Sequence, residues 1–347
     1  MSDRIVPVGI VGLGRAGWSL HALTLERLPE MYRVVAVSDP DPKRQEEAHD
    51  RFDCRAYAEF SELIADEGVE LVAVASPSHL HAPQAIDAMR AGKHVLVEKP
   101  FATSLEDADA MIAVSQETGR ILTASQNSRY APDFLKIREV FDSGVLGDIL
   151  TVRIAWHRFT RRWDWQTLKE FGGGELNNSG SHVIDQALLL IGDAEVDVFC
   201  HRVSTPLSSG DAEDHIKVVL KADNGIVVDI ECTMACAYPQ DRWLVMATRG
   251  GLVGNGNTLR WKYFDPSTLP PRPIDRKPTP DRSYNREDLP WTEKTYEAPR
   301  ETFNQRNRRL YEDLYRTLRE GAPLAITPES VRRQVAVLER CRELSPV

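Results

Sequence analysis

The stretch IVPVGIVGLGRAG, residues 5–17, decides the fold of this 347-residue chain. Its first part, Ile5–Val11, has the length and the composition of a buried strand. Gly12, Gly14 and Gly17 follow with the spacing G-x-G-x-x-G, which is typical of dinucleotide sites when it joins a strand to a helix. Gly12 permits a tight turn, Gly14 lets the backbone approach a pyrophosphate, and Gly17 lets the helix pack closely on the strand.

The glycine turn and the next strand together predict the cofactor. The start of the helix offers backbone amides and the positive end of its dipole to the phosphates, and Asp39 follows the second apolar run about 20 residues after the last glycine, where a ribose-binding acid is expected. A carboxylate there repels a 2′-phosphate by about 1 kcal/mol in water and about 4 kcal/mol at intermediate dielectric. NAD is therefore favoured over NADP. The basic residues Lys43 and Arg44 keep the alternative open, because they are able to bind a 2′-phosphate. The expected cofactor contacts in this part are Gly12, Leu13, Gly14, Arg15, Ala16 and Asp39.

Short apolar runs alternate with helical stretches as far as residue 125. Such unbroken runs fit strands that are buried on both faces of a parallel sheet, and the alternation indicates βαβ units. The fold class is therefore α/β, with a doubly wound Rossmann dinucleotide-binding domain over residues 1–125. The runs are Ile5–Val11, Val34–Val37, Leu71–Ala75, His94–Val97 and Ile121–Ala124.

Residues 126–347 carry different signals and predict a substrate-binding and oligomerisation domain with a large open, mostly antiparallel sheet. Asn224-Gly225 and Asn255-Gly256 each separate β-type runs, which is a strong hairpin signal. Residues 265–300 contain eight prolines and predict an extended loop or arm that crosses to a neighbouring subunit. Two helices are expected at the end, over Thr302–Glu320 and Pro328–Leu344, the last of them packing back on the first domain.

The composition and charge of the chain indicate which class of partner it binds and where in the cell it is expected. The net charge of −9 argues against nucleic acid, which needs a basic surface. The chain holds no run of 18 apolar residues, so no membrane span is expected, and its first strand begins too early for a secretory leader. Five scattered cysteines fit buried, reduced thiols. We therefore expect a cytoplasmic protein that binds a small molecule.

Two later segments carry chemistry. Glu98-Lys99-Pro100 follows the run His94–Val97, and ligands bind at this carboxyl edge of an open parallel sheet. Residues 172–185, GGGELNNSGSHVID, lead from a glycine cluster into an apolar helix. Asn178 and His182 in this segment are one turn apart and share a helix face. The pair His79 and His81 lacks a third ligand, so no metal is expected.

With these motifs in this order, the chain resembles the Gfo/Idh/MocA family of oxidoreductases. The resemblance covers nearly the whole chain and includes Ser76–Pro83 and Trp163–Trp165. It implies a Rossmann domain followed by an α/β domain whose open sheet forms a homodimer or homotetramer. It also implies hydride transfer between nicotinamide and a carbinol carbon of a sugar, inositol or related polyol.

The resemblance implies roles for individual residues. Lys99 matches the conserved motif lysine and His182 the usual catalytic histidine, both acting on the substrate oxygen. A histidine has the pKa of a suitable proton acceptor, near 6.5, and a lysine ammonium stabilises developing alkoxide charge. The expected catalytic residues are Lys99, His182 and Asn178. The substrate contacts are the same three with Trp165, and the contacts to the nicotinamide half are Ser76, Pro77, His81, Glu98 and Lys99.

Asn178 departs from the family pattern, in which many members carry an aspartate four residues before the histidine. An amide cannot stabilise an imidazolium by charge, and loss of such a carboxylate costs about 10⁴ in the serine-protease example. Three possibilities stay open: Asn178 binds a substrate hydroxyl, Asp185 or water supplies the missing interaction, or catalysis is lost. In the last case the protein is a non-catalytic NAD-binding sensor or regulator.

Overall fold

The computed structural model describes residues 4–277 and 282–347. The first part of the chain forms a parallel sheet with the strand order β3-β2-β1-β4-β5-β6. The order reverses between β1 and β4, so the sheet is doubly wound, as the sequence predicts. Its strands are β1 (Val6–Val11), β2 (Tyr32–Ser38), β3 (Arg55–Tyr57), β4 (Leu71–Val74), β5 (His94–Val97) and β6 (Leu122–Ala124).

The helices of this part begin and end at residues with clear local causes. In α5 the Ser104 hydroxyl accepts from the amide of Asp107, and Gly119 ends the helix in the left-handed region at φ 65°. The segment after the glycine turn, Ala16–Ala22, is a π-helix rather than a regular α-helix, and π-helical turns are frequent at functional sites. The α-helices are α1 (Leu23–Leu25), α2 (Pro42–Phe52), α3 (Phe60–Ala65), α4 (His81–Arg90) and α5 (Leu105–Thr118).

The second sheet has eight strands in the order β14-β13-β12-β11-β7-β10-β9-β8. Among the described strands of this sheet, only β7 and β10 are parallel neighbours; every other pair is antiparallel. Both Asn-Gly hairpins are confirmed, between β9 and β10 and between β12 and β13. The strands are β7 (Ile149–His157), β8 (Val196–Val203), β9 (His215–Ala222), β10 (Val227–Thr233), β11 (Trp243–Ala247), β12 (Gly250–Gly254), β13 (Thr258–Tyr263) and β14 (Thr292–Glu297).

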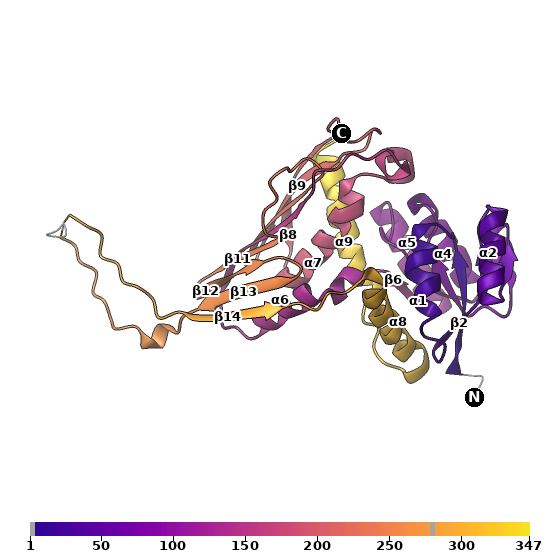
Figure 1. The fold of residues 1–347 in the computed structure, drawn as a ribbon, viewed down its shortest axis with the longest axis horizontal. Coiled ribbons are helices and arrows are strands. Elements are labelled where there is room, and N and C mark those ends of the chain that lie inside the picture. Colours follow the sequence, from indigo (N-terminus) through magenta and orange to yellow (C-terminus); the bar gives the residue numbers. More distant parts are fainter. Residues whose placement is uncertain (1–3, 278–281) are drawn as a thin grey trace.

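The prediction of a loop without regular structure over residues 265–300 is wrong at its end. Residues Thr292–Glu297 form β14, the edge strand of the sheet, which pairs with β13. The strand is nearly all polar and exposed, so it lacks the apolar alternation by which a strand is recognised in a sequence. The described residues between β13 and β14, 264–277 and 282–291, project beyond the sheet as an extended arm (Figure 1).

Helices cover the inner face of the second sheet and join it to the first domain. Figure 1 shows α7 and α9 between the sheet and the first domain. Val331 and Val335 of α9 belong to the first hydrophobic core, whereas Val337 and Leu338 belong to the second. The helix α8 packs on the first core through Leu310 and Tyr311. These helices are α6 (Pro132–Asp142), α7 (Ser181–Ile191), α8 (Phe303–Glu320) and α9 (Pro328–Leu344). No helix among the described residues has the length and apolar character to cross a membrane.

Asp185 pairs with Arg129 and not with His182, so the interpretation in which it supplies the interaction missing at Asn178 is wrong. It is 1% exposed and accepts two hydrogen bonds from Arg129, at 2.8 Å from Nε and 2.6 Å from Nη2. A further guanidinium nitrogen of Arg129 donates to the Ser330 hydroxyl of α9. The pair therefore fastens α7 to the segment that leaves the first domain.

Asp185→Asn is expected to lower the free energy of unfolding by about 3–5 kcal/mol, because it leaves the Arg129 guanidinium buried without its counter-charge. Urea unfolding followed by circular dichroism measures the loss. Asp193→Asn, which neutralises an exposed carboxylate just after the same helix, is the control and should change stability by no more than about 0.5 kcal/mol. Equal stabilities for the two variants would contradict the proposed role of the pair.

Candidate active site

A cavity of about 840 Å³ runs along the carboxyl edge of the first sheet into the interface between the two halves of the molecule. Its volume is within the usual range for ligand sites, about 300–1,000 Å³. One end lies at the glycine turn and Asp39, and the other lies at Lys99 and Asn178. Of the residues predicted from the sequence, those that line it are Gly12, Gly14, Arg15, Ala16, Asp39, Ser76, Pro77, His81, Glu98, Lys99, Trp165 and Asn178.

The glycine turn has the geometry of a dinucleotide cradle. Gly12 has φ +84°, which side chains rarely adopt, and a Cβ on Gly17 would lie 1.8 Å from the carbonyl oxygen of Gly12. A Cβ on Gly14 would meet nothing within 4 Å, so the backbone there is open toward the cavity. These glycines fit the phosphates of a dinucleotide. Leu13 is the exception among the predicted cofactor contacts, because its side chain lies in the core.

Asp39 holds the turn and also faces the cavity. Its Oδ2 accepts the amide of Leu13 at 2.7 Å, and its Oδ1 accepts the amide of Asp41 at 3.0 Å. The guanidinium of Arg44 lies 3.4 Å from Oδ2. Arg44 also lines the cavity, so a positive charge accompanies the carboxylate at the place where a ribose would bind.

His81 connects two loops at the middle of the cavity. It is 1% exposed, with Nδ1 2.7 Å from the Pro100 carbonyl oxygen and Nε2 2.9 Å from that of Ser76. Burial lowers the pKa of this imidazole. Both neighbours are carbonyl acceptors, so the neutral ring donates to one of them at a time. His81 forms part of the cavity wall, and Pro77 is exposed.

Lys99 and Asn178 meet at the inner end of the cavity, although they come from the two different domains. The Lys99 ammonium donates to Oδ1 of Asn178 at 2.9 Å and lies 3.4 Å from the backbone oxygen of the same residue. Lys99 follows β5, and Asn178 lies in the π-helical segment Leu176–Gly180 that precedes α7. The structure thus gives Asn178 a definite partner, which is the motif lysine rather than His182.

Burial and neighbouring charges change the pKa values of Lys99 and Glu98 in different ways. Burial lowers the pKa of Lys99, an effect that Glu98 opposes and Arg15 reinforces. Burial would raise the pKa of Glu98, but the hydrogen bond and charge of His21, a hydrogen bond from Ser125 and the charge of Lys99 outweigh it and hold this pKa at about 2. Glu98 is therefore ionised at neutral pH.

His182 is not among the residues that line the cavity. It is 8% exposed, and its Nδ1 has no hydrogen-bond partner among the described residues. Its ring stacks on Trp156 with 6.5 Å between centroids. Burial and the charge of Lys99 lower the pKa of His182 to about 3, so this imidazole is neutral at neutral pH.

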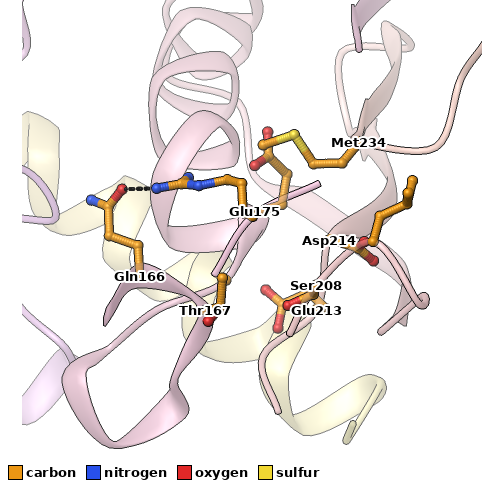
Figure 2. Close-up of a pocket in the computed structure, with 10 residues that line it drawn as sticks. Gln166, Thr167, Glu175, Ser208, Glu213, Asp214 and Met234 are labelled. Atoms are coloured by element: carbon orange, nitrogen blue, oxygen red, sulfur yellow. Dashed lines mark hydrogen bonds between the residues drawn. The ribbon is translucent and has the colours of Figure 1, made fainter. Parts of the chain in front are cut away.

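Trp165 stands at the outer part of the cavity and is 46% exposed. Its segment is held by Arg162, which donates to Asp164 at 3.0 Å and to Gln166 at 2.6 Å. Figure 2 marks the bond to Gln166 with a dashed line. Beyond Arg162 and Gln166 lies a separate small cavity of about 20 Å³, lined in part by Glu175 (Figure 2). That volume holds about one water molecule, so this small cavity is too small for a cofactor or a substrate.

Several residues that line the cavity carry no clear signal in the sequence. Arg162 lies close to Trp165 in the chain and Gln166 follows it directly, and Asn177 is next to Asn178. A polar neighbour of a motif is a weak signal, because its direction depends on tertiary packing. Trp163, by contrast, is 77% exposed and does not line the cavity, and Trp156 contacts His182 instead.

Comparison with known proteins agrees with this geometry. Residues 6–126 match the sequence profile of an oxidoreductase family with an NAD-binding Rossmann fold, and residues 134–253 match the GFO/IDH/MocA C-terminal domain. The chain belongs to the Gfo/Idh/MocA oxidoreductase family. This membership confirms the resemblance seen in the sequence, including the α/β fold with two sheets.

Individual relatives of this Gfo/Idh/MocA protein include two named inositol enzymes. Inositol 2-dehydrogenase 2 of Saccharopolyspora erythraea is 31% identical over 271 residues, 76% of this chain and 75% of that protein. The scyllo-inositol 2-dehydrogenase (NADP(+)) IolW of Bacillus subtilis is 32% identical over 189 residues, 54% of this chain and 52% of that protein. A levoglucosan dehydrogenase, solved with NADH and levoglucosan, superposes with a TM-score of 0.81 at 20% identity, over 98% of this chain and 97% of that chain.

Proposed function

We propose that this Gfo/Idh/MocA protein transfers a hydride between NAD and a carbinol carbon of a sugar, inositol or related polyol. The observation that carries the proposal is the Lys99–Asn178 contact at the inner end of a cavity that begins at the glycine turn. A polyol hydroxyl placed there would meet an ammonium donor and an amide. When bound, the nicotinamide supplies hydride transfer. The names of the inositol dehydrogenases among the relatives support the substrate class.

The charged and polar residues of the site have different roles in the proposed reaction. Lys99 lines the cavity, and its lowered pKa makes it a suitable proton acceptor for the substrate hydroxyl. The ammonium form then donates to the same oxygen when the reaction runs toward the alcohol. Asn178 orients the lysine and offers its amide to a neighbouring hydroxyl. The assignment of His182 as the base stays a prediction, because a group with a pKa of about 3 accepts protons weakly at neutral pH.

A panel of inositols, sugars and sugar acids with NAD tests the proposal, with the absorbance of NADH as the readout. We expect at least one polyol to reduce NAD at a rate that depends on enzyme concentration. The rival function, a non-catalytic NAD-binding regulator, is favoured by the uncharged Asn178. If NAD and a polyol both bind by calorimetry and no member of the panel or its ketone reacts, the regulator is the better explanation.

NAD is expected to bind more tightly than NADP, because Asp39 repels a 2′-phosphate. Arg44 reduces the difference, since it lies beside the carboxylate. Arg44→Ala should therefore weaken NADP more than NAD, and Lys43→Ala, the neighbouring basic residue that does not line the cavity, should leave the ratio unchanged. Calorimetric titration of both cofactors measures this, and equal or tighter binding of NADP to the unaltered protein would refute the preference.

We propose a homodimer or homotetramer that uses the outer face of the second sheet. Leu150 on β7 is 50% exposed and Met246 on the neighbouring strand β11 is 49% exposed, whereas the helices cover the opposite face. Exposed apolar side chains of this kind mark interaction surfaces. Light scattering should give a multiple of 39.1 kDa, and Met246→Glu should shift the population toward monomer. A monomer at micromolar concentration without any substitution would exclude this assembly.

A further inference from the structure

Three buried side chains form a hydrogen-bonded line that ends at the motif lysine. The Tyr311 hydroxyl lies 2.7 Å from Nδ1 of His21, and Nε2 of the same imidazole lies 3.0 Å from Oε1 of Glu98. The other oxygen of Glu98 accepts the backbone amide of Lys99 at 3.1 Å. Tyr311 and His21 are 0% exposed and Glu98 is 5% exposed. The line joins α8, the π-helix after the glycine turn and the end of β5, elements far apart in the sequence.

The direction of the hydrogen bond to Glu98 follows from the groups involved. A carboxylate can only accept, so Nε2 of His21 carries a hydrogen and donates to Glu98. Burial raises the pKa of Tyr311 well above its ordinary value, so the phenol stays protonated beside Nδ1 of His21. The backbone oxygen of Tyr311 accepts the hydroxyl of Tyr32 at 2.7 Å, which fixes the residue that starts the line. Both nitrogens of the imidazole are thereby satisfied.

Glu98 depends on this line for its charge. Its carboxylate is buried, and burial alone favours the neutral acid. His21 is the largest influence that opposes burial, through its hydrogen bond and its charge, and Ser125 and Lys99 add to it, since a hydrogen bond to the ionised form stabilises it. The two residues are neighbours in the chain, joined by the bond from the Lys99 amide to Glu98, and the negative charge of Glu98 opposes the lowering of the Lys99 pKa by burial.

We propose that His21 and Tyr311 are positioning residues that keep Glu98 ionised and so set the protonation of Lys99 in the active site. Neither residue lines the cavity, so they act through Glu98 and do not touch the substrate. The inference rests on the proposed function, in which Lys99 exchanges a proton with the substrate hydroxyl. The pKa of Lys99 also depends on the charges of Arg15, Arg162 and Glu175. The charge of Lys99 in turn lowers the pKa of His182.

The test measures the titration midpoint of Lys99 in the cofactor-free protein. Lysine labelled with ¹³C at Cε gives one NMR signal per residue, and Lys99→Arg identifies the signal that belongs to Lys99. We expect His21→Leu to lower the titration midpoint of Lys99 by about one pH unit or more, because the loss of a neighbouring opposite charge has an effect of this size. Tyr311→Phe should lower it in the same direction by less. His21→Gln, whose side-chain amide can still donate to Glu98, should restore the midpoint.

Matched controls separate this role from a structural one. Tyr315→Phe removes a hydroxyl from the next turn of α8, where the ring packs on Tyr32 and not on His21, and should leave the midpoint unchanged. In turnover assays the acid limb of the kcat/KM profile should move to lower pH with His21→Leu and Tyr311→Phe. Unchanged Lys99 midpoints in both folded variants would overturn the inference. Shifted midpoints without turnover of any polyol would leave it standing and reject the proposed function instead.

Discussion

Lys99→Met is expected to lower kcat by about 10²–10⁴-fold, the usual contribution of a positioned acid–base group, with little change in NAD affinity. The lysine lies at the inner end of the cavity with its ammonium on Asn178, whereas the glycine turn and Asp39 lie at the other end. Methionine keeps nearly the length of the side chain and removes the exchangeable proton. Steady-state kinetics with the best polyol of the panel, together with calorimetry of NAD, measures both quantities.

Lys221→Met on β9 is the control for this substitution, because Lys221 is exposed and lies on the second sheet, away from the cavity. It should leave both kcat and NAD affinity unchanged. If Lys99→Met kept the full kcat, Lys99 would have no role in the reaction. A variant that loses NAD binding and turnover together would show that Lys99 serves the cofactor and not the substrate.

Gly17→Ala is expected to weaken NAD binding more than about 100-fold, equivalent to about 2.8 kcal/mol, and to lower the free energy of unfolding by about 1–3 kcal/mol. The added Cβ would lie 1.8 Å from the carbonyl oxygen of Gly12. Both atoms are held by the backbone, so the turn itself must move, and this displaces the amides that face the phosphates. Calorimetry of NAD and urea unfolding measure the two effects.

Gly14→Ala is the informative comparison. A Cβ at Gly14 meets nothing in the protein within 4 Å, so this variant should be as stable as the unaltered protein. It should nevertheless bind NAD weakly, because the methyl group fills space that the pyrophosphate would use. Tight NAD binding by Gly14→Ala would contradict the placement of the cofactor phosphates at this turn.

Features with local causes could be predicted from the sequence. The strand, glycine turn and following aspartate occupy one continuous stretch, and the two Asn-Gly hairpins depend on two residues each. The same holds for α9, whose first residue is the proline after Thr327, with the threonine hydroxyl accepting the amide of Ser330. In each case the residues that decide the conformation are neighbours in the chain.

Features that depend on a distant partner could not be predicted. The carboxylate of Asp185 is held by Arg129, 56 residues away, and His21 reaches Tyr311 across 290 residues. No periodicity or spacing encodes such pairs. Lys99 and Asn178 are an intermediate case: each belongs to a recognisable motif, but their contact requires the two domains to close on one another.

Transfer of deuterium from a polyol to the cofactor tests the proposed hydride transfer most directly. The best substrate of the panel, deuterated at the reacting carbon, is incubated with NAD and the enzyme, and the reduced cofactor is analysed by mass spectrometry. We expect NADH to gain one deuterium with the unaltered enzyme, and Lys99→Met to form labelled NADH only at its residual rate. Reduced cofactor without the label, or bound NAD and polyol without any transfer, would contradict hydride transfer from the carbinol carbon.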